Sequence, residues 1–469
     1  MLFPTFIFTV FFLIVWPLNW ILMRKPNRWL ALMLVAGYVF YAWWDWRFAF
    51  LLAASTLANQ AFAVQVAKKR AQNHRKAILV AAVVANLGVL AWFKYFNFFT
   101  TSAANLLSEV GVHWLAPTVT SVLPVGISFF TFMALSYVVD AYRGTFEPTS
   151  LSRFAVFLSF FPHIVAGPIV RPAELVPQFD EPRDPRRIDA ARAFFLIGGG
   201  LFKKVVISSY MASLADPIFR APESHSAPEV ILGVVAYSLQ IYSDFSGYTD
   251  MAIGIALLLG FEFPQNFDKP YSAVGMRDFW RRWHMTLSRW LRDYLYIPLG
   301  GNRKGPSRTS LNLLATMVLG GLWHGAAWTF LAWGTLHGVA LVAEHRIDAR
   351  RVLAGRDKVL PAWAGKLFSF SFVTFAWIFF RATSFGNAFD VIGRMFSGWT
   401  SPGTVSLGAI AVIAGMIAIQ QLPLGYGQRA MSAFSRVHWA LQGVALGAFL
   451  MLAGALSPAG VAPFIYFQF

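Results

Sequence analysis

The sequence contains no cysteine among its 469 residues. This absence excludes disulfide bonds, thiolate metal sites, palmitoylation and an acyl intermediate on a cysteine sulfur. Charged residues are also scarce: they make up 13% of the chain, whereas soluble domains carry about a quarter. No polar block exceeds about 40 residues, which is too few for an ordinary soluble domain. The composition therefore predicts one all-α, polytopic membrane domain that covers residues 1–469.

Motifs for metal ions and nucleotides are missing as well. The sequence has no HExxH, no cysteine pair and no carboxylate–histidine cluster at ligand spacing, so we expect no metal and no bound cofactor. A net charge of +17 could suggest a nucleic-acid partner. The basic residues fall in short loops between apolar segments, however, and this is the positive-inside pattern of a membrane protein. We therefore expect a lipid bilayer and no nucleic acid.

Apolar segments long enough to cross a bilayer recur along the chain. They lie near residues 3–23, 29–46, 48–66, 77–93, 119–139, 193–213, 229–260, 367–380, 404–421 and 437–456. The first has no basic leader and no cleavage site, so it is predicted to be a retained span and not a signal peptide. Basic loops after the first and third segments place the N-terminus outside and residues 95–118 in an external connection. The pattern predicts about eleven crossings.

Two stretches are interrupted. The segment RFAVFLSFFPHIVAGPIVRPAEL contains several prolines and glycines, which favours a re-entrant or kinked element over a clean crossing. Residues 309–345 are too long for one straight crossing. The glycines of this stretch predict two short helices that meet near His324.

His324 lies in LGGLWHGAAW, inside a long stretch without a charged residue. A titratable group in hydrocarbon is costly and indicates a functional site. Its small neighbours let another backbone or a substrate approach closely, and a neutral imidazole can accept a hydroxyl proton near pH 7. The alternative is a histidine that only packs helices together. We predict that His324 is the catalytic base of an acyl transfer.

His284 lies in the basic and aromatic run DFWRRWHMTLSRWL. Helical spacing places Arg277, Arg281, His284 and Ser288 on one face. One interpretation is an amphipathic helix at the membrane interface. The other is a cytoplasmic mouth that binds the phosphates of a thioester donor, because arginine suits phosphate recognition. On the second interpretation His284 is catalytic, and the donor-binding residues are Arg277, Arg281, Arg282 and Trp283.

Two acidic residues, Asp244 and Asp250, lie in the apolar segment QIYSDFSGYTDMAIG. Intramembrane carboxylates must be paired or line a cavity, and the candidate partners are Lys203 and Lys204 or an arginine of the basic run around His284. A structural or orienting ion pair and a catalytic role are both open.

Packing roles are predicted for two further histidines. His163 lies in the kinked FFPHIVAGP element, and His337 lies thirteen residues after His324, nearly on the opposite face of a continuous helix.

The C-terminal segment FIYFQF is aromatic and carries no charged side chain. A disordered tail would be polar, so this one is predicted to dock in a groove. Simple anchoring is one role for it. The other is that Tyr466 accepts the acyl group temporarily, which would require a nearby base because a phenol has a pKa of about 10.

Several long motifs in one order resemble the membrane-bound O-acyltransferase family, in the bacterial branch that includes the membrane component of alginate O-acetylation. They are LPVGISFFTFMALSYVVDAYRG, FPHIVAGPIVRPAEL, QIYSDFSGYTDMAIG, DFWRRWHMTLSRWLRDYLYIPLGGNRKG, GLWHGAAWTFLAWGTLHG, WIFFRA and FIYFQF. The family's invariant membrane histidine matches His324, and its second histidine matches His284. The resemblance implies a central funnel or tunnel through a ring of helices, with His324 at its narrow point.

The resemblance also implies a function. The expected donor is a cytoplasmic thioester, acetyl-CoA in the alginate-like branch, and the expected acceptor is an extracytoplasmic polysaccharide. A periplasmic, esterase-like acetyltransferase is the implied partner, and the bacterial inner membrane is the implied location. The close alternative is a D-alanyl transferase that uses an acyl carrier protein. From other classes, a transporter or flippase would also explain broken helices and intramembrane charges, and a scaffold would leave the glycine-flanked base unexplained.

Overall fold

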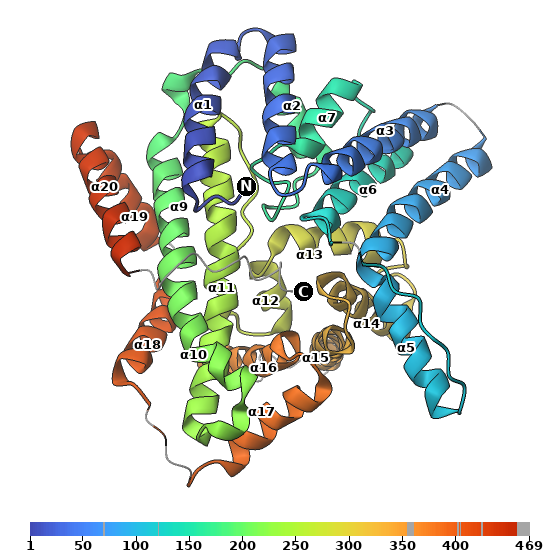
Figure 1. Cartoon of the computed structure of the whole chain (residues 1–469), viewed down its shortest axis with the longest axis vertical. Coiled ribbons are helices and arrows are strands. Elements are labelled where there is room, and N and C mark those ends of the chain that lie inside the picture. The colour runs from blue at the N-terminus through green and yellow to red at the C-terminus, as the bar shows by residue number, and fades with distance from the viewer. Residues whose placement is uncertain are drawn as a thin grey trace. The chain divides into compact units, whose positions relative to one another are not determined.

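A computed structural model gives the fold of the chain (Figure 1). It describes residues 1–68, 71–120, 122–353, 361–400, 403, 405–423 and 425–456. Every regular element in these residues is a helix, so the all-α prediction is confirmed for the described part of the chain. The chain divides into two compact units, Met1–Ala193 with Ala252–Pro264, and Phe194–Met251 with Gln265–Phe469.

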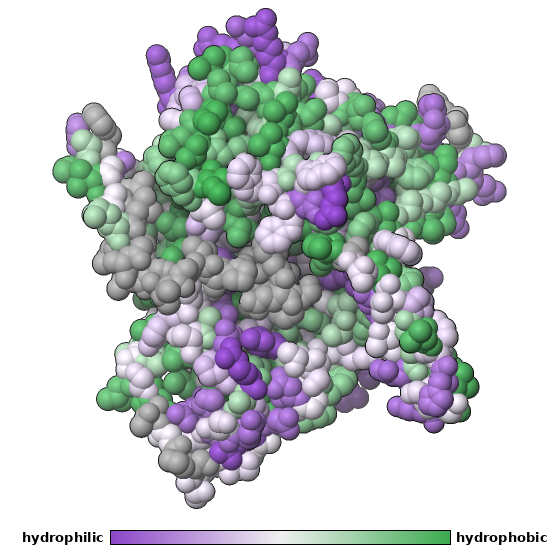
Figure 2. Space-filling view, in the orientation of Figure 1, coloured by the Kyte–Doolittle hydropathy of each residue, from purple (hydrophilic) through white to green (hydrophobic). Residues whose placement is uncertain are grey.

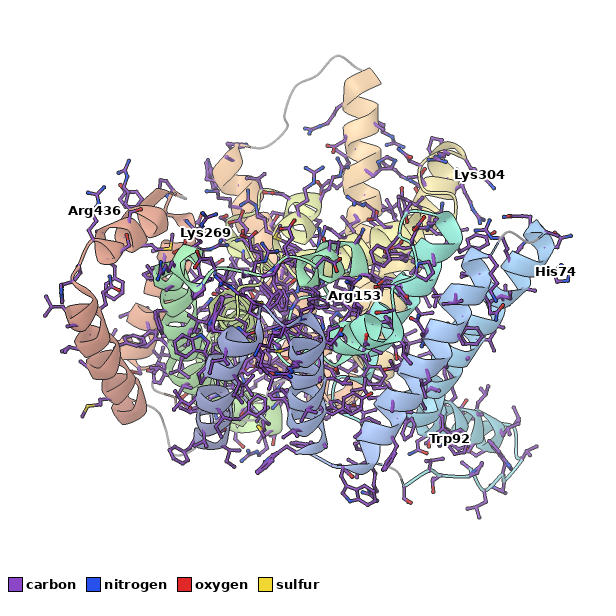
Figure 3. The ribbon with its side chains drawn as sticks, turned by 90° about the horizontal axis from the view of Figure 1, so that it is seen from above. His74, Trp92, Arg153, Lys269, Lys304 and Arg436 are labelled. Atoms are coloured by element: carbon purple, nitrogen blue, oxygen red, sulfur yellow. The ribbon has the colours of Figure 1, made fainter. Side chains whose placement is uncertain are left out.

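The first unit contains the N-terminal helices. They are α1 (Phe6–Leu22), α2 (Pro26–Ala42), α3 (Arg47–Ala67), α4 (Gln72–Leu90), a π-helical turn (Ala91–Tyr95), α5 (Phe96–Glu109), α6 (Ile127–Arg143), α7 (Leu151–Ser159) and the short α8 (Pro172–Leu175). Both α3 and α4 pack on α6, which is buried along most of its length. Figure 3 shows His74, in the first turn of α4, and Trp92, in the π-helical turn that follows α4. An amide pair joins α3 to α4: Asn59 and Asn86 exchange hydrogen bonds of 3.1 and 2.8 Å.

The predicted kinked element is confirmed. The segment between α7 and α8 is buried and is not helical from residue 160 to residue 171. His163 lies within it, fully buried. Its Nε2 is 2.8 Å from the Phe157 carbonyl oxygen, and its ring stacks on Phe263 with centroids 5.5 Å apart. These are packing contacts, of the kind expected for this residue.

Three described helices are long and apolar enough to cross a bilayer: α3, the continuous run Gln72–Glu109, and α16 (Ala362–Arg381). A bent pair, α18 (Leu407–Gln421) with α19 (Gly425–Ser435), brings the number to four if it is one span. The prediction of about eleven crossings is therefore not confirmed, because many helices are shorter or more polar than a span. Within the predicted external connection 95–118, helix continues through the π-helical turn to Glu109, and the external location of these residues stays a prediction.

Hydrophobic side chains cover much of the surface of α1 and α2 in Figure 2, and hydrophilic ones gather at the connection between them. That connection carries Arg24 and Lys25, and α2 begins with Arg28 in its first turn. On α1, apolar side chains such as Phe6 and Leu13 are more than half exposed, at 82% and 64%. An exposed apolar face beside a basic loop is what a membrane-embedded helix presents to lipid.

The second unit contains the later helices, and α9 (Ala190–Phe202) and α11 (Ala227–Leu258) contribute residues to both units. Besides α16, α18 and α19, its helices are α10 (Ser208–Arg220), α12 (Met276–Arg282), α13 (Met285–Leu291), α14 (Gly305–His324), α15 (Trp328–Leu353), α17 (Phe385–Ser397) and α20 (Trp439–Leu456). π-Helical turns at Lys203–Ile207 and Arg292–Tyr296 follow α9 and α13.

The helices α14 and α15 form a close-packed hairpin, in which α14 ends at His324 and α15 begins at Trp328. The predicted break near His324 is confirmed, but the helices have 20 and 26 residues and are not short. Glycine allows their approach: a Cβ on Gly321 would lie 2.3 Å from the Phe330 carbonyl oxygen, and one on Gly334 would lie 2.4 Å from that of Met317. These glycines therefore bring another backbone close to the histidine.

Candidate active site

His324 is the last residue of α14 and is 3% exposed. Aromatic rings enclose it in near-perpendicular contacts. The centroids of Trp323, Trp333 and Phe380 lie 5.0, 5.1 and 5.3 Å from that of His324. Because α14 ends at His324, the imidazole lies at the end of the hairpin where α14 connects to α15. Trp333 of α15 and Phe380 of α16 contact it there. Three aromatic rings therefore form the immediate surroundings of the imidazole.

His284 does not share a helix face with Arg277, Arg281 and Ser288, so that prediction is wrong. The run is broken into α12 and α13, and His284 lies between them in the left-handed conformation, with φ of 42°. The cause is Asn266, whose carbonyl oxygen accepts from Met285 N at 2.9 Å. The Asn266 side-chain oxygen accepts from the Thr286 amide and hydroxyl at 3.2 and 2.9 Å. These bonds begin α13 at Met285.

The same Asn266 oxygen determines which nitrogen of His284 carries the proton. It lies 3.2 Å from His284 Nδ1 and can only accept, so Nδ1 donates and Nε2 keeps its lone pair. Among the described residues, Nε2 has no hydrogen-bond partner. Burial lowers the pKa of His284, which lies in a segment too short to span a bilayer, to about 3. The side chain is therefore a neutral imidazole with an available acceptor atom.

Trp323 connects the two histidines. Its ring centroid lies 6.2 Å from that of His284 and 5.0 Å from that of His324. Phe245 closes His284 from another side, with centroids 4.7 Å apart. The structure therefore brings the two histidines, forty positions apart in the sequence, next to one indole ring.

A pocket of about 500 Å³ lies beside this cluster within the second unit. Four arginines line it: Arg277, Arg281, Arg289 and Arg292. Other lining residues come from α12, α13 and the segment that follows α13, and they are Trp280, Met285, Ser288, Leu291, Tyr296 and Asn302. The helices α14 and α15 contribute Thr309, Leu313, Thr316, Met317, Leu341 and His345. Arg277 and Arg281, which were predicted to bind the donor, thus line this pocket, and donor binding by them stays a prediction. Neither His324 nor His284 lines this pocket. Met317 does, and it precedes His324 by seven residues on α14, a helix rise of about 10 Å.

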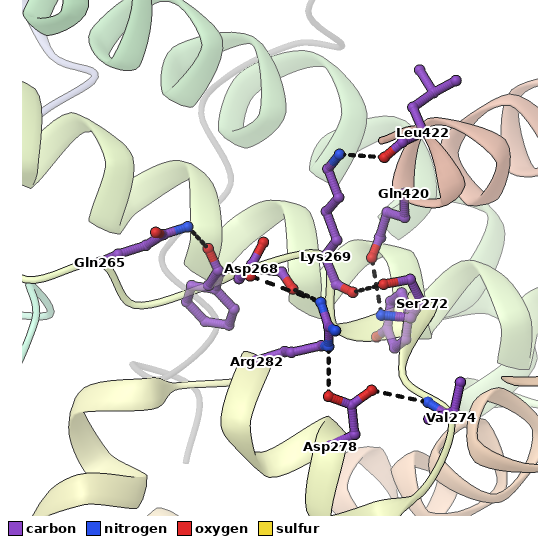
Figure 4. Close-up of polar contacts among 11 residues, drawn as sticks. Gln265, Asp268, Lys269, Ser272, Val274, Asp278, Arg282, Gln420 and Leu422 are labelled. Carbon is purple, nitrogen blue, oxygen red and sulfur yellow. Dashed lines mark hydrogen bonds and ion pairs between the residues drawn. The ribbon is translucent and has the colours of Figure 1, made fainter. Parts of the chain in front are cut away.

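Arg282 and Trp283, also predicted to bind the donor, do not line the pocket. Arg282 instead bonds Asp278 at 2.8 Å and lies 3.8 Å from Asp268, as Figure 4 shows. Trp283 is fully buried, with its ring centroid 5.0 Å from that of Phe267 and 5.1 Å from that of Trp377. The chain changes direction at His284 between α12 and α13. The prediction had assumed one continuous helix without this turn.

The sequence reasoning missed several lining residues. Arg289 and Arg292 continue the arginine spacing of the same run, and this signal could have found them. Arg292 is held by Asp293 through a hydrogen bond of 2.6 Å, which raises its pKa. His345 comes from α15, far along the chain, and no local pattern indicates it.

Two carboxylates of α15 hold α12 against the pocket. The Glu344 side chain accepts from the backbone amides of Met276 and Arg277 at 2.7 and 3.1 Å, at the start of α12. Asp348 pairs with the Arg277 guanidinium at 3.2 Å. Gly275 leaves room for the carboxylate, since a Cβ there would lie 3.1 Å from a Glu344 oxygen. These contacts orient the basic wall and were not predicted.

Asp250 and Asp244 pair with the neighbouring lysines, as the sequence suggested. Lys203 binds Asp250 at 2.5 Å, and Lys204 binds Asp244. The second pair is 2% and 3% exposed, whereas the first is 22% and 26% exposed. The lysines lie on the π-helical turn after α9, where Gly200 and Gly247 bring the backbones of α9 and α11 together. The pairs join two elements and lie outside the pocket lining.

His337 is not opposite to His324, so that prediction is wrong. The break after His324 reverses the chain, and both histidines contact Trp333, with centroids 4.8 and 5.1 Å from its ring. Tyr466 lies outside the described residues. Among the residues that are described, no group of three or more metal-ligating side chains is present.

Comparison with known proteins gives the family. The profile of the membrane-bound O-acyltransferase family matches residues 72–384. A probable alginate O-acetylase AlgI of Azotobacter vinelandii is 43% identical over 79% of this chain and 73% of its own. The peptidoglycan O-acetyltransferase of Helicobacter pylori is 39% identical over 79% and 73%, and a teichoic acid D-alanyltransferase of Streptococcus thermophilus is 30% identical over 50% and 59%. The chain therefore belongs to the membrane-bound O-acyltransferase family and is an O-acyltransferase.

Proposed function

We propose that this enzyme moves an acetyl group from a cytoplasmic thioester, acetyl-CoA, across the membrane for O-acetylation of an extracytoplasmic polysaccharide such as alginate. The observation that carries the proposal is the α14–α15 hairpin, which holds a buried imidazole at one end and lines an arginine-rich pocket at the other. The similarity to named O-acetylases supports the acetyl group and the polysaccharide acceptor.

In the proposed reaction the phosphates of the donor bind the arginines of the pocket, because guanidinium groups form charge-assisted bonds to phosphate oxygens. The acyl end extends toward His324. His324 removes the proton of an acceptor hydroxyl, whose oxygen attacks the thioester carbonyl. The C–S bond then breaks, and the thiolate leaves and takes up the proton. N–H groups near Trp323 and Gly325 stabilise the developing oxyanion, and His284 is the second catalytic histidine.

The proposal also covers the topology and the partner of the enzyme. The chain forms one domain that crosses the bacterial inner membrane about eleven times around a central funnel. A periplasmic acetyltransferase is the partner that completes the transfer. Tyr466 is proposed to carry the acetyl group outward. Replacing Tyr466 by Phe separates this role from anchoring, because an aromatic anchor should tolerate the loss of the hydroxyl.

D-Alanyl transfer from an acyl carrier is the second candidate. The D-alanyltransferase relatives are 30% and 32% identical over about half of this chain, whereas the O-acetylase relatives are 39–43% identical over more than three quarters of it. This difference favours acetyl transfer. A transporter would not need the base beside the pocket.

The experiment is deletion of the gene followed by mild alkaline release of ester-linked groups from the purified envelope polysaccharides. Loss of acetate that returns with the wild-type gene supports the proposal. Loss of D-alanine with unchanged acetate supports the second candidate, and unchanged amounts of both contradict the two together.

A further inference from the structure

A cluster of three contacting rings connects the pocket with His324, and two of these rings are fully buried. Trp280 lines the pocket, Trp333 contacts His324, and His337 contacts both indoles. The centroid separations are 5.2 Å for Trp280 and His337, 4.8 Å for Trp333 and His337, and 5.8 Å for the two indoles. We name these three side chains the indole–imidazole cluster. On α15, Trp333, His337 and the pocket residue Leu341 follow at four-residue intervals, so they share one helix face.

The polar atoms of this cluster have no hydrogen-bond partner among the described residues. This applies to Nδ1 and Nε2 of His337 and to Nε1 of Trp280 and of Trp333, all of which are buried. His337 is 0% exposed and Trp333 is 1% exposed. One buried unsatisfied polar group costs about 1–3 kcal/mol, and native structures keep few of them. A polar ligand that bonded to these four atoms, which lie on three touching side chains, would remove that cost.

The chemistry of the cluster defines that ligand. Each indole offers one N–H donor, and a neutral imidazole offers one N–H donor and one acceptor nitrogen. The cluster contains no ionised side chain, so a charged group would be poorly stabilised there. A fitting ligand is uncharged and presents carbonyl oxygens together with an N–H. A secondary amide followed by a thioester carbonyl has this pattern, whereas a phosphate would be bound by the arginines on the other side of Trp280.

We propose that the indole–imidazole cluster binds the amide–thioester arm of a pantetheine-type donor, with His337 as its central residue. The inference rests on the proposed function, since it takes a thioester as the donor. It adds a residue that recognises the donor between the phosphate-binding arginines and the base. Coenzyme A and the phosphopantetheinyl group of a carrier protein share this arm, so either source of the acyl group fits the cluster.

The test measures ligand affinity with the full chain in lipid nanodiscs, by titration against an environment-sensitive fluorescence or heat signal. The ligands are acetyl-CoA, S-acetyl-4′-phosphopantetheine, S-acetyl-N-acetylcysteamine and adenosine 3′,5′-bisphosphate. The His337→Phe variant keeps an aromatic ring and removes both nitrogens. We expect it to bind the three thioesters about tenfold more weakly and the bisphosphate with unchanged affinity. His337→Gln restores one donor and one acceptor and should recover part of the affinity.

Trp280→Phe, which removes one indole N–H, should weaken the same three ligands. Phe372→Leu is the matched control, because Phe372 packs on His337 with centroids 5.8 Å apart and contributes no polar atom. Higher affinity for acetyl-CoA than for the phosphopantetheine thioester identifies coenzyme A as the source, and equal affinities identify a carrier protein.

Thioester affinities of folded His337→Phe and His337→Gln that equal those of the wild type overturn the inference and leave the proposed function in place. Equal losses in Phe372→Leu and His337→Phe overturn it also, because the effect would then come from packing. If no thioester binds the wild type, the proposed donor and the inference both fail.

Discussion

At the scale of single residues, the side-chain amide of Asn266 determines the orientation and the tautomer of His284. Asn266 fixes the tautomer of His284 through the 3.2 Å contact to Nδ1, and it also begins α13 through Thr286. The combination leaves Nε2 as the acceptor atom. Partners that hold a histidine ring in one tautomer often matter as much as the ring itself.

Asn266→Ala should lower kcat for acetyl transfer at least about tenfold while changing the donor KM little, because the imidazole loses its orientation and its fixed tautomer. The measurement is acetyl transfer in proteoliposomes. Thr286→Val is the control, since it removes the hydroxyl donor and keeps the bond to His284. Wild-type kcat in folded Asn266→Ala would show that the tautomer of His284 has no role.

The candidate site residues could be selected from the sequence, but their neighbours in space could not. His324 is recognisable because it is a titratable group inside an uncharged, glycine-rich stretch. The left-handed turn at His284 was missed because DFWRRWHMTLSRWL has helical spacing and contains no glycine or proline. The break is imposed by Asn266, eighteen residues earlier, and a tertiary contact of that kind leaves no mark in a local pattern.

At the scale of elements, α1, α2, α3 and α4 begin and end within about five residues of the predicted apolar windows, because length and hydropathy define them. Glu344 shows what such patterns omit. Its carboxylate accepts from the first amides of α12, although it belongs to α15 and is 68 positions from Met276. Nothing in either segment alone indicates that the basic wall of the pocket depends on this contact.

Glu344→Ala should raise the donor KM several-fold and leave kcat nearly unchanged, because α12 loses the acceptor for its first amides and Arg277 is no longer held in place. Loss of a helix cap costs about 0.5–2 kcal/mol. Glu344→Gln keeps an acceptor oxygen and should have the smaller effect. Steady-state kinetics over a range of acetyl-CoA concentrations measure the difference, and an unchanged KM in Glu344→Ala would contradict the positioning role.

The two lysine–aspartate pairs provide a matched comparison between elements. Removing one partner of a buried pair costs about 3–5 kcal/mol, because a charge is left without compensation. Asp244→Asn should therefore lower the melting temperature clearly, since Asp244 and Lys204 are almost fully buried.

Asp250→Asn should lower it less, because Asp250 and Lys203 are about a quarter exposed. The double variant Lys204→Met/Asp244→Asn should regain part of the lost stability. Thermal unfolding in detergent is the measurement. A larger loss in Asp250→Asn than in Asp244→Asn would contradict the ranking by burial.

At the scale of the whole molecule, the all-α membrane class followed from low charge and long apolar runs, and the family followed from its motifs. The number of crossings did not. Hydropathy windows mark apolar segments, but many of these form helices that are short, bent or joined by π-helical turns, as in Lys203–Ile207. A window has no information about where such breaks fall.

The central claim is that His324 is the base of the acetyl transfer. The most direct measurement is the ester-linked acetate of the extracytoplasmic polysaccharide in cells that carry His324→Ala in place of the wild-type gene, at matched amounts of membrane protein. His163→Ala is the control, because it removes another buried histidine that belongs to the first unit. The account predicts acetate at the level of the gene deletion for His324→Ala and close to the wild-type level for His163→Ala, whereas wild-type acetate with His324→Ala would contradict it.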